Sequence, residues 1–168
     1  NEPRLGERID VHSLNAVGER LYRLHVGPPV MATRDTVAAL VRAASAAVAG
    51  HKFSHHFLTT EWEQVVDAWQ LEGWDAYRDV ARLGRKTRLP EAQRKVLWAI
   101  FERVRAGLRD RRQMSYAELF TRLAAAIRDR KVRPFDFAVV DESQDLTVAQ
   151  LRFLAALGGD RPNALFFS

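Results

Sequence analysis

Two adjacent carboxylates, Asp141 and Glu142, are the side chains of this sequence best placed to do chemistry. They directly follow a short apolar run, Phe137 to Val140, which predicts a buried strand. In open parallel sheets, ligands bind at the edge where the strands end. One carboxylate at that edge can hold a Mg²⁺ that bridges phosphate oxygens, and an adjacent one can orient and deprotonate an attacking water. The alternative is an acidic turn in which Asp145 or Thr147 only caps the next helix.

The elements around this pair predict a parallel α/β unit. Thr147 can cap a helix with an apolar face, a Gly-Gly-Asp-Arg-Pro turn follows, and residues 164–168 have the composition of a second strand. A strand, a crossover helix and a second strand make a parallel pair. Residues 9–12 predict a third strand, placed before a helix that Ser13 can cap. Capping boxes also predict helix starts at Thr60, with Glu63, and at Ser115, with Glu118.

The fold class expected is therefore α/β, with a mostly helical part inserted into a parallel sheet. Residues 1–26 and 113–168 form the sheet-containing part, and residues 27–112 form the inserted subdomain. With 168 residues, of which 47% are hydrophobic, the chain is long enough for a buried core.

Basic residues are concentrated in one segment of the chain. Lys and Arg number 26 against 21 Asp and Glu, a net charge of +5. The segment Arg82–Arg112 alone holds 11 basic and 3 acidic residues, a net of +8, so the remainder has a net of −3. This distribution predicts either a surface for nucleic acid or a solvated basic helix face.

Several classes of protein are excluded by composition. The sequence has no cysteine, which removes disulfides, thiol catalysis and cysteine zinc sites. The longest apolar stretch, Val37 to Ala49, is interrupted by Arg42 and predicts no membrane span. No apolar signal segment is visible near the first residue, so a cytoplasmic location is expected.

The acidic pair belongs to a longer pattern with a family resemblance. Val-Asp-Glu-Ser-Gln-Asp-Leu-Thr-x-x-Gln, residues 140–150, resembles the Walker B box (motif II) of superfamily-1 DNA helicases of the UvrD/Rep type. Residues 9–15, Ile-Asp-Val-His-Ser-Leu-Asn, are similar to the Thr-Phe-His-Ser-Leu segment of that family, with Asp10 and Val11 in place of Thr-Phe. The similarity covers most of the chain, strongly from Met114 onward and loosely in residues 57–98.

This resemblance implies a partial RecA-like parallel sheet, a P-loop NTPase core without its P-loop. No Gly-x-x-x-x-Gly-Lys-Ser/Thr occurs, and Gly84-Arg-Lys-Thr does not match it. The chain is therefore expected to be a fragment of the first motor domain with its helical insertion. The expected partners are single-stranded or partly duplex DNA and the rest of the helicase chain, which would hold the P-loop segment and the second RecA-like domain; no membrane partner is expected.

The family's functional residues can be carried over position by position. Asp141 would hold the Mg²⁺ of MgATP, and Glu142 would be the catalytic base for the attacking water. Gln144 and Asp145 would couple the nucleotide site to DNA, and Gln150 would be structural. Two residues of the histidine-serine segment, His12 and Ser13, would lie beside single-stranded DNA.

The remaining candidates have simpler alternatives. Arg85, Lys86 and Arg88 lie in a loop bounded by glycine and proline and are candidates for phosphate contacts. The histidines His51, His55 and His56 are better explained by a loop than by a metal site. The aromatic residues can stack on bases or form the core of the helical part, and helical spacing favours the core. These are Trp62, Trp69, Trp74, Tyr77 and Trp98.

Three functions compete at this point. The first is an ATP-dependent DNA helicase or translocase whose isolated fragment is inactive. The second is a non-catalytic DNA-binding or partner-binding module that keeps the motif as a relic. The third, a metal-dependent nuclease that uses Asp141 and Glu142, leaves the Ser-Gln-Asp extension unexplained.

Overall fold

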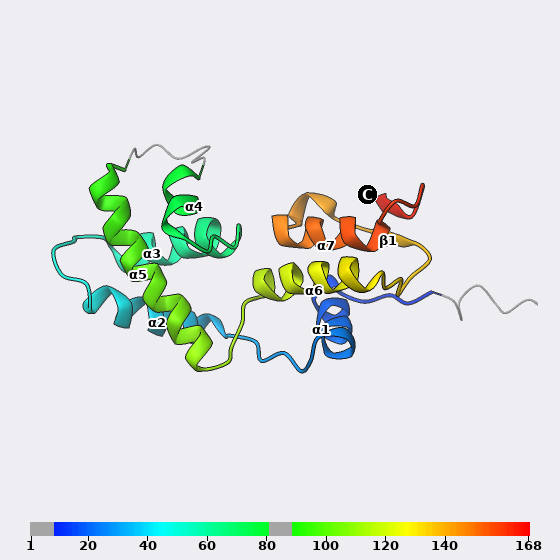
Figure 1. The fold of residues 1–168 in the computed structure, drawn as a ribbon, viewed down its shortest axis with the longest axis horizontal. Coiled ribbons are helices and arrows are strands. Elements are labelled where there is room, and N and C mark those ends of the chain that lie inside the picture. Colours follow the sequence, from blue (N-terminus) through cyan, green and yellow to red (C-terminus); the bar gives the residue numbers. More distant parts are fainter. Residues whose placement is uncertain (1–8, 81–88) are drawn as a thin grey trace, which may run out of the picture.

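The computed structural model describes residues 9–80 and 89–168, and this part is mostly helical with a small parallel sheet (Figure 1). An α/β class is compatible with this composition. The helices are α1 (Leu14–His25), α2 (Arg34–Ala46), α3 (His55–Glu61), the π-helix η2 (Trp62–Asp67), α4 (Trp74–Asp79), α5 (Glu91–Asp110), α6 (Tyr116–Arg130), the 3₁₀-helix η3 (Ser143–Asp145) and α7 (Val148–Gly158). The strands are β1 (Ala138–Val140) and β2 (Leu165–Phe167).

Hydroxyl side chains begin most of the longer helices. Ser13, Ser115 and Thr147 each accept a hydrogen bond from a backbone N–H three residues later, which confirms the predicted starts of α1, α6 and α7. The start predicted at Thr60 is wrong, because Ser54 caps α3 and the helix runs through Thr60. Ser54 satisfies the free N–H of Phe57 at 3.2 Å, so the helix begins earlier in the sequence than Thr60 predicts.

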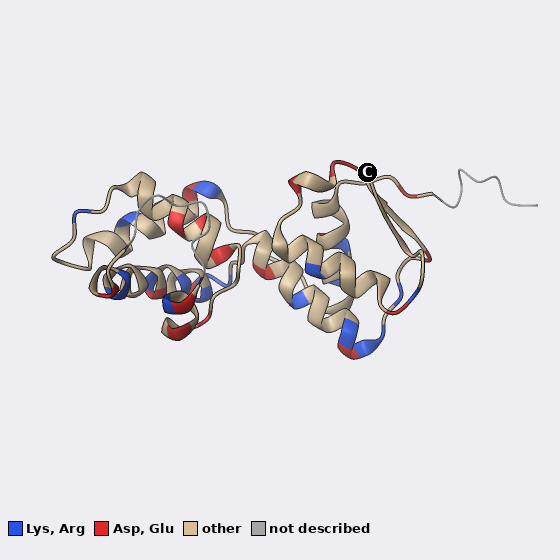
Figure 2. Cartoon of the chain, turned by 90° about the horizontal axis from the view of Figure 1, so that it is seen from above, with Lys and Arg blue, Asp and Glu red and all other residues tan. Residues whose placement is uncertain are grey.

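Two separate hydrophobic cores divide the described chain into two lobes, seen side by side in Figures 1 and 2. The helical lobe contains α2 to α5, and its core is built on an aromatic cluster. The rings of Tyr77 and Trp98 stack with centroids 5.5 Å apart, and Phe101 lies 5.9 Å from Tyr77. The sheet lobe contains α1, α6, α7 and both strands, with Phe120 and Phe153 at its centre.

The lobes are joined by two chain segments that pair with each other. The N–H of Met114 donates to the carbonyl of Val30, and the N–H of Ala32 donates to the carbonyl of Met114, both at 2.9 Å. Ser115 also donates its hydroxyl proton to Asp67 Oδ1 at 2.6 Å, so the cap of α6 is tied to the end of η2. These bonds fix the point at which the chain leaves and re-enters the sheet lobe.

The sheet consists of one parallel pair in register Ala138↔Leu165 to Val140↔Phe167, connected through α7. Val140 and Leu165 pack on the sheet-lobe core. The opposite face is open, because Val139 is 75% exposed and Phe166 49% exposed. Parallel sheets are normally covered on both faces, whereas the described residues cover only one face of this pair.

The strand predicted at residues 9–12 does not form. The segment is extended but unpaired, and Val11 is 87% exposed. A strand needs a neighbour for its backbone N–H and C=O groups, and none of the described residues pairs with this segment.

Candidate active site

The acidic pair lies at the carboxyl end of β1, as the sequence predicts for a ligand-binding edge. Val140 is the last residue of the strand, and Asp141 and Glu142 follow it on the surface. The parallel strand β2 ends beside them at Phe167, and the N–H of the next residue, Ser168, donates to the carbonyl of Val140 at 2.9 Å. The turn that carries Asp141 and Glu142 is therefore attached to the ends of both strands.

A set of hydrogen bonds orients Asp141. Its Oδ1 accepts from the N–H of Glu142 at 3.0 Å and from the hydroxyl of Ser168 at 3.3 Å. Its Oδ2 makes no hydrogen bond within the described residues. One carboxylate oxygen is thus fixed by the protein, and the other is free for a ligand.

Glu142 has an unusual backbone conformation. It lies in the left-handed region, with φ 54° and ψ 45°. A residue with a side chain adopts this region at a cost of order 1 kcal/mol or more, and such residues cluster at functional sites. The left-handed turn lets the N–H of Ser143 donate to the carbonyl of Ser168 at 3.1 Å, so the turn is anchored to β2.

Gln144 contacts Glu142 directly, because its amide Nε2 donates to Glu142 Oε2. Asp145 is exposed and ends the short helix η3. The structure thus brings Asp141, Glu142, Gln144 and the end of β2 together. For Asp145 it shows only a surface position one turn away from the pair.

Gln150 links the acidic turn to α1. It forms a capping box with Thr147 and donates its Nε2 to Asn15 Oδ1 at 3.4 Å. This hydrogen bond joins the first turn of α7, which follows the acidic turn, to the first turn of α1, which follows His12 and Ser13. Ser13 is occupied as the cap of α1, whereas the ring of His12 is exposed and makes no hydrogen bond within the described residues.

The donor set fits a metal that is shared with phosphate oxygens. Within the part of the chain that the structure describes, no group of three or more His, Cys, Asp or Glu side chains could hold an ion alone. Mg²⁺ is commonly bound by one or two carboxylates together with water and substrate phosphates, which two adjacent exposed carboxylates at a strand end can provide.

The chain matches no protein-family model, no curated protein and no solved structure.

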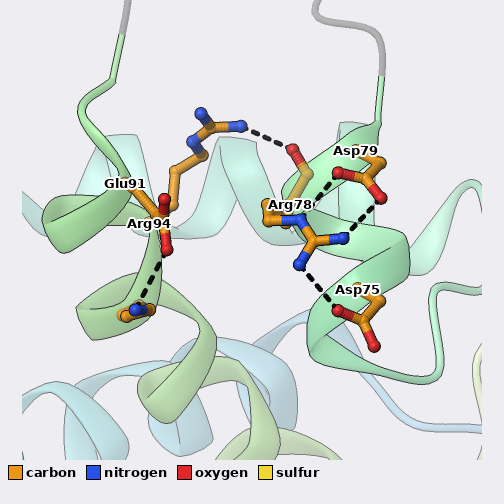
Figure 3. A network of polar contacts seen from close by, with 6 residues as sticks. Asp75, Arg78, Asp79, Glu91 and Arg94 are labelled. Atoms are coloured by element: carbon orange, nitrogen blue, oxygen red, sulfur yellow. Dashed lines mark hydrogen bonds and ion pairs between the residues drawn. The ribbon is translucent and has the colours of Figure 1, made fainter.

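The three basic loop candidates, Arg85, Lys86 and Arg88, lie outside the described residues. The helices on either side of them are tied together (Figure 3). Arg94 of α5 donates to the carbonyl of Arg78 at the end of α4. Arg78 also binds the carboxylates of Asp75 and Asp79, at 2.9 and 2.8 Å. Arg94 within the basic segment, and Arg78 shortly before it, are thus engaged within the protein.

Two of the three histidine candidates and most of the aromatic candidates have structural contacts. His51 contacts the carbonyl of Ser45 through Nε2 at 3.2 Å and accepts from the N–H of Phe53, so both ring nitrogens are occupied. His55 contacts the carbonyl of Ala38 at 3.1 Å. The prediction that the aromatic residues form a core is confirmed for the buried side chains but not for Trp69, which is 46% exposed. The buried ones are Trp62, Tyr77 and Trp98.

Sequence reasoning missed a cavity between the lobes. It has a volume of about 330 Å³ and is lined by charged side chains from η2, α5 and α6, including Asp67, Arg105 and Glu118. Burial raises the pKa of Asp67 to about 6, although hydrogen bonds from Ser115 and Gln70 act in the opposite direction. No local pattern marks Asp67, because its partner Ser115 is distant in sequence.

None of the helices in the described ranges has both the length and the apolar character that a membrane crossing requires.

Proposed function

We propose that this chain carries the magnesium-binding and water-activating carboxylates of an ATP-driven DNA motor. The observation that carries the proposal is the position of Asp141 and Glu142 at the carboxyl end of a parallel strand, next to the end of a second one. Residues 140–150 resemble the Walker B box of superfamily-1 helicases, and this resemblance is the reason for assigning Mg²⁺ binding and water activation to the pair.

A RecA-like core is the finer fold that we propose for the sheet lobe. Its support is the β1–α7–β2 crossover, together with the open face at Val139 and Phe166, where a further layer would pack. The unpaired residues 9–12 would become a strand once a neighbouring strand is present.

The residues would divide the work as follows. Asp141 would hold Mg²⁺ through its free oxygen, while Ser168 and the N–H of Glu142 fix the other oxygen. Glu142 would orient the attacking water and accept its proton, and Gln144 would keep the Glu142 carboxylate in place. When bound, Mg²⁺ neutralises charge on the phosphate oxygens. Asp145 and His12 would lie between this site and DNA.

A non-catalytic module that binds DNA or a partner is the second candidate. It is favoured by the open apolar face of the sheet and by the absence of a P-loop pattern from the sequence. In that case Asp141 and Glu142 would be a surface turn without a ligand.

DNA-stimulated phosphate release by the intact protein distinguishes the two. Asp141→Ala should abolish phosphate release, because it removes the carboxylate proposed to hold the metal. Asp136→Asn is the matched control, since it removes an exposed carboxylate just before the same strand, at its other end. Equal activity of Asp141→Ala and Asp136→Asn, or no activity in the wild type, would favour the non-catalytic module.

A further inference from the structure

The C-terminal ends of α1 and α6 together form a strongly basic surface that is separate from the acidic pair. Residues 128–133 contain four basic residues and one acidic residue, Asp129. Arg23 of α1, from a distant part of the sequence, is a further basic residue near the end of its helix. We call the exposed residues Arg23, Arg128, Lys131 and Arg133 the basic corner.

A backbone contact brings the two helix ends together. Arg130 donates through Nη1 to the carbonyl of His25 at 2.6 Å, so the end of α1 abuts the end of α6. Lys131 has φ 51°, and this left-handed residue turns the chain out of α6 toward the strands. Lys and Arg gather on this side of the sheet lobe (Figure 2).

Helix-dipole interactions account for only part of these charges. Cations stabilise helix C-termini, and Arg23 and Arg128 lie in the last turns of α1 and α6, whereas Arg133 follows the end of α6. Arg130 donates to the last carbonyl of α1, and the N–H groups of Lys131 and Val132 donate to the carbonyls of Arg128 and Ile127. Within the described residues, no side chain of the basic corner forms an ion pair or a hydrogen bond to a carbonyl.

The basic corner and the acidic pair lie at opposite ends of β1. Arg133 precedes the strand and Asp141 follows it, so the length of β1 separates them. The basic corner is therefore not part of the strand end that carries Asp141. The unpaired guanidinium groups instead suit a long phosphate polymer, since each planar fork can bind a phosphate bidentately.

We propose that the basic corner binds the phosphate backbone of nucleic acid without sequence preference. This contact is additional to the nucleotide site and does not depend on hydrolysis. Anionic lipid is the competing source of phosphate, because Leu24, 70% exposed, lies next to Arg23 and could enter a bilayer surface.

The test is a charge-neutralising variant of the full chain with a matched control. The corner variant carries Arg128→Gln, Lys131→Gln and Arg133→Gln. The control variant carries Arg34→Gln, Arg42→Gln and Lys52→Gln, which are exposed residues of the helical lobe without ion pairs among the described residues. Both variants lose the same charge, and circular dichroism checks that both are folded.

Binding is measured by fluorescence anisotropy on a labelled single strand and a labelled duplex between about 50 and 200 mM salt. Each lost phosphate contact should lower the slope of log K against log salt by about 0.7 on single strands and about 0.9 on duplex. The corner variant should therefore lose about two to three in slope, and the control variant should keep the wild-type slope.

Three results would overturn the proposal: an unchanged slope in the corner variant, an equal loss in both variants, or no DNA binding by the wild type. Sedimentation with phosphatidylserine vesicles adds a fourth, namely that the corner variant loses vesicle binding and keeps DNA binding. The binding measurements need no ATP, so this test is independent of the proposed hydrolysis.

Discussion

Replacing the largely buried Asp67 with asparagine should remove one pH-dependent contribution to the free energy of unfolding of the helical lobe. Burial raises the pKa of Asp67 from 3.8 to about 6, against the hydrogen bonds from Ser115 and Gln70; Glu118 raises it further and Arg105 lowers it. Between these two pH values the folded chain holds more protons than the unfolded chain. Stability is therefore highest below pH 4 for this group and is lost as the pH rises to about 6.

The size of the effect follows from the two pKa values. The difference between 3.8 and about 6, at about 1.4 kcal/mol per pH unit, corresponds to at most ~3 kcal/mol. Asp67→Asn keeps an oxygen that can accept from both Ser115 and Gln70 but cannot ionise. Relative to the wild type, the variant should gain up to ~3 kcal/mol in free energy of unfolding as the pH rises from well below 4 to 7.

Urea unfolding followed by tryptophan fluorescence measures this difference. All four tryptophans, residues 62, 69, 74 and 98, belong to the helical lobe, so the signal reports the part that contains Asp67. Asp35→Asn, at an exposed position in the first turn of α2, is the matched control and should change by less than about 1 kcal/mol over the same range. If the difference in free energy of unfolding between the wild type and Asp67→Asn does not change from pH 4 to 7, the cost assigned to burying the Asp67 carboxylate is wrong.

Three further predictions concern other parts of the chain. The isolated chain should release no phosphate from ATP, because it contains no P-loop pattern to hold the β and γ phosphates; DNA-stimulated release by the purified chain would contradict this. Neutralising Arg85, Lys86 and Arg88 together should flatten the salt dependence of DNA binding by about two to three in slope, and an unchanged slope would make them a solvated face. Gly18→Ala should destabilise the sheet lobe by about 1–3 kcal/mol in thermal unfolding, because a Cβ there would lie 2.6 Å from a ring atom of Phe120; an unchanged melting temperature would show that α1 shifts freely.

Local patterns were sufficient to predict several helix starts and the acidic strand end. The caps at Ser13, Ser115 and Thr147 depend on a hydroxyl and an N–H three residues later, so neighbouring residues determine them. The apolar run before Asp141 predicted β1 for the same reason. At Thr60 the same pattern was misleading, because Ser54 supplies an earlier cap and the helix continues.

Features that depend on distant residues were not predictable. The segment 9–12 has a strand composition, but a strand also requires a neighbour, and composition does not supply one. The basic corner combines Arg23 with residues more than a hundred positions later, so a sliding count of charge found the segment Arg82–Arg112 instead. The burial of Asp67 likewise depends on how η2 meets the cap of α6.

The most direct test of the central claim separates nucleotide binding from turnover in the intact protein with Glu142→Gln. The glutamine keeps an oxygen that can accept from Gln144 but cannot take a proton from water, so MgATP should bind with nearly unchanged affinity. Turnover should fall by about 10² or more, the lower range for loss of a general base. A variant that binds MgATP and hydrolyses it at the wild-type rate would remove Glu142 from the mechanism and contradict the account.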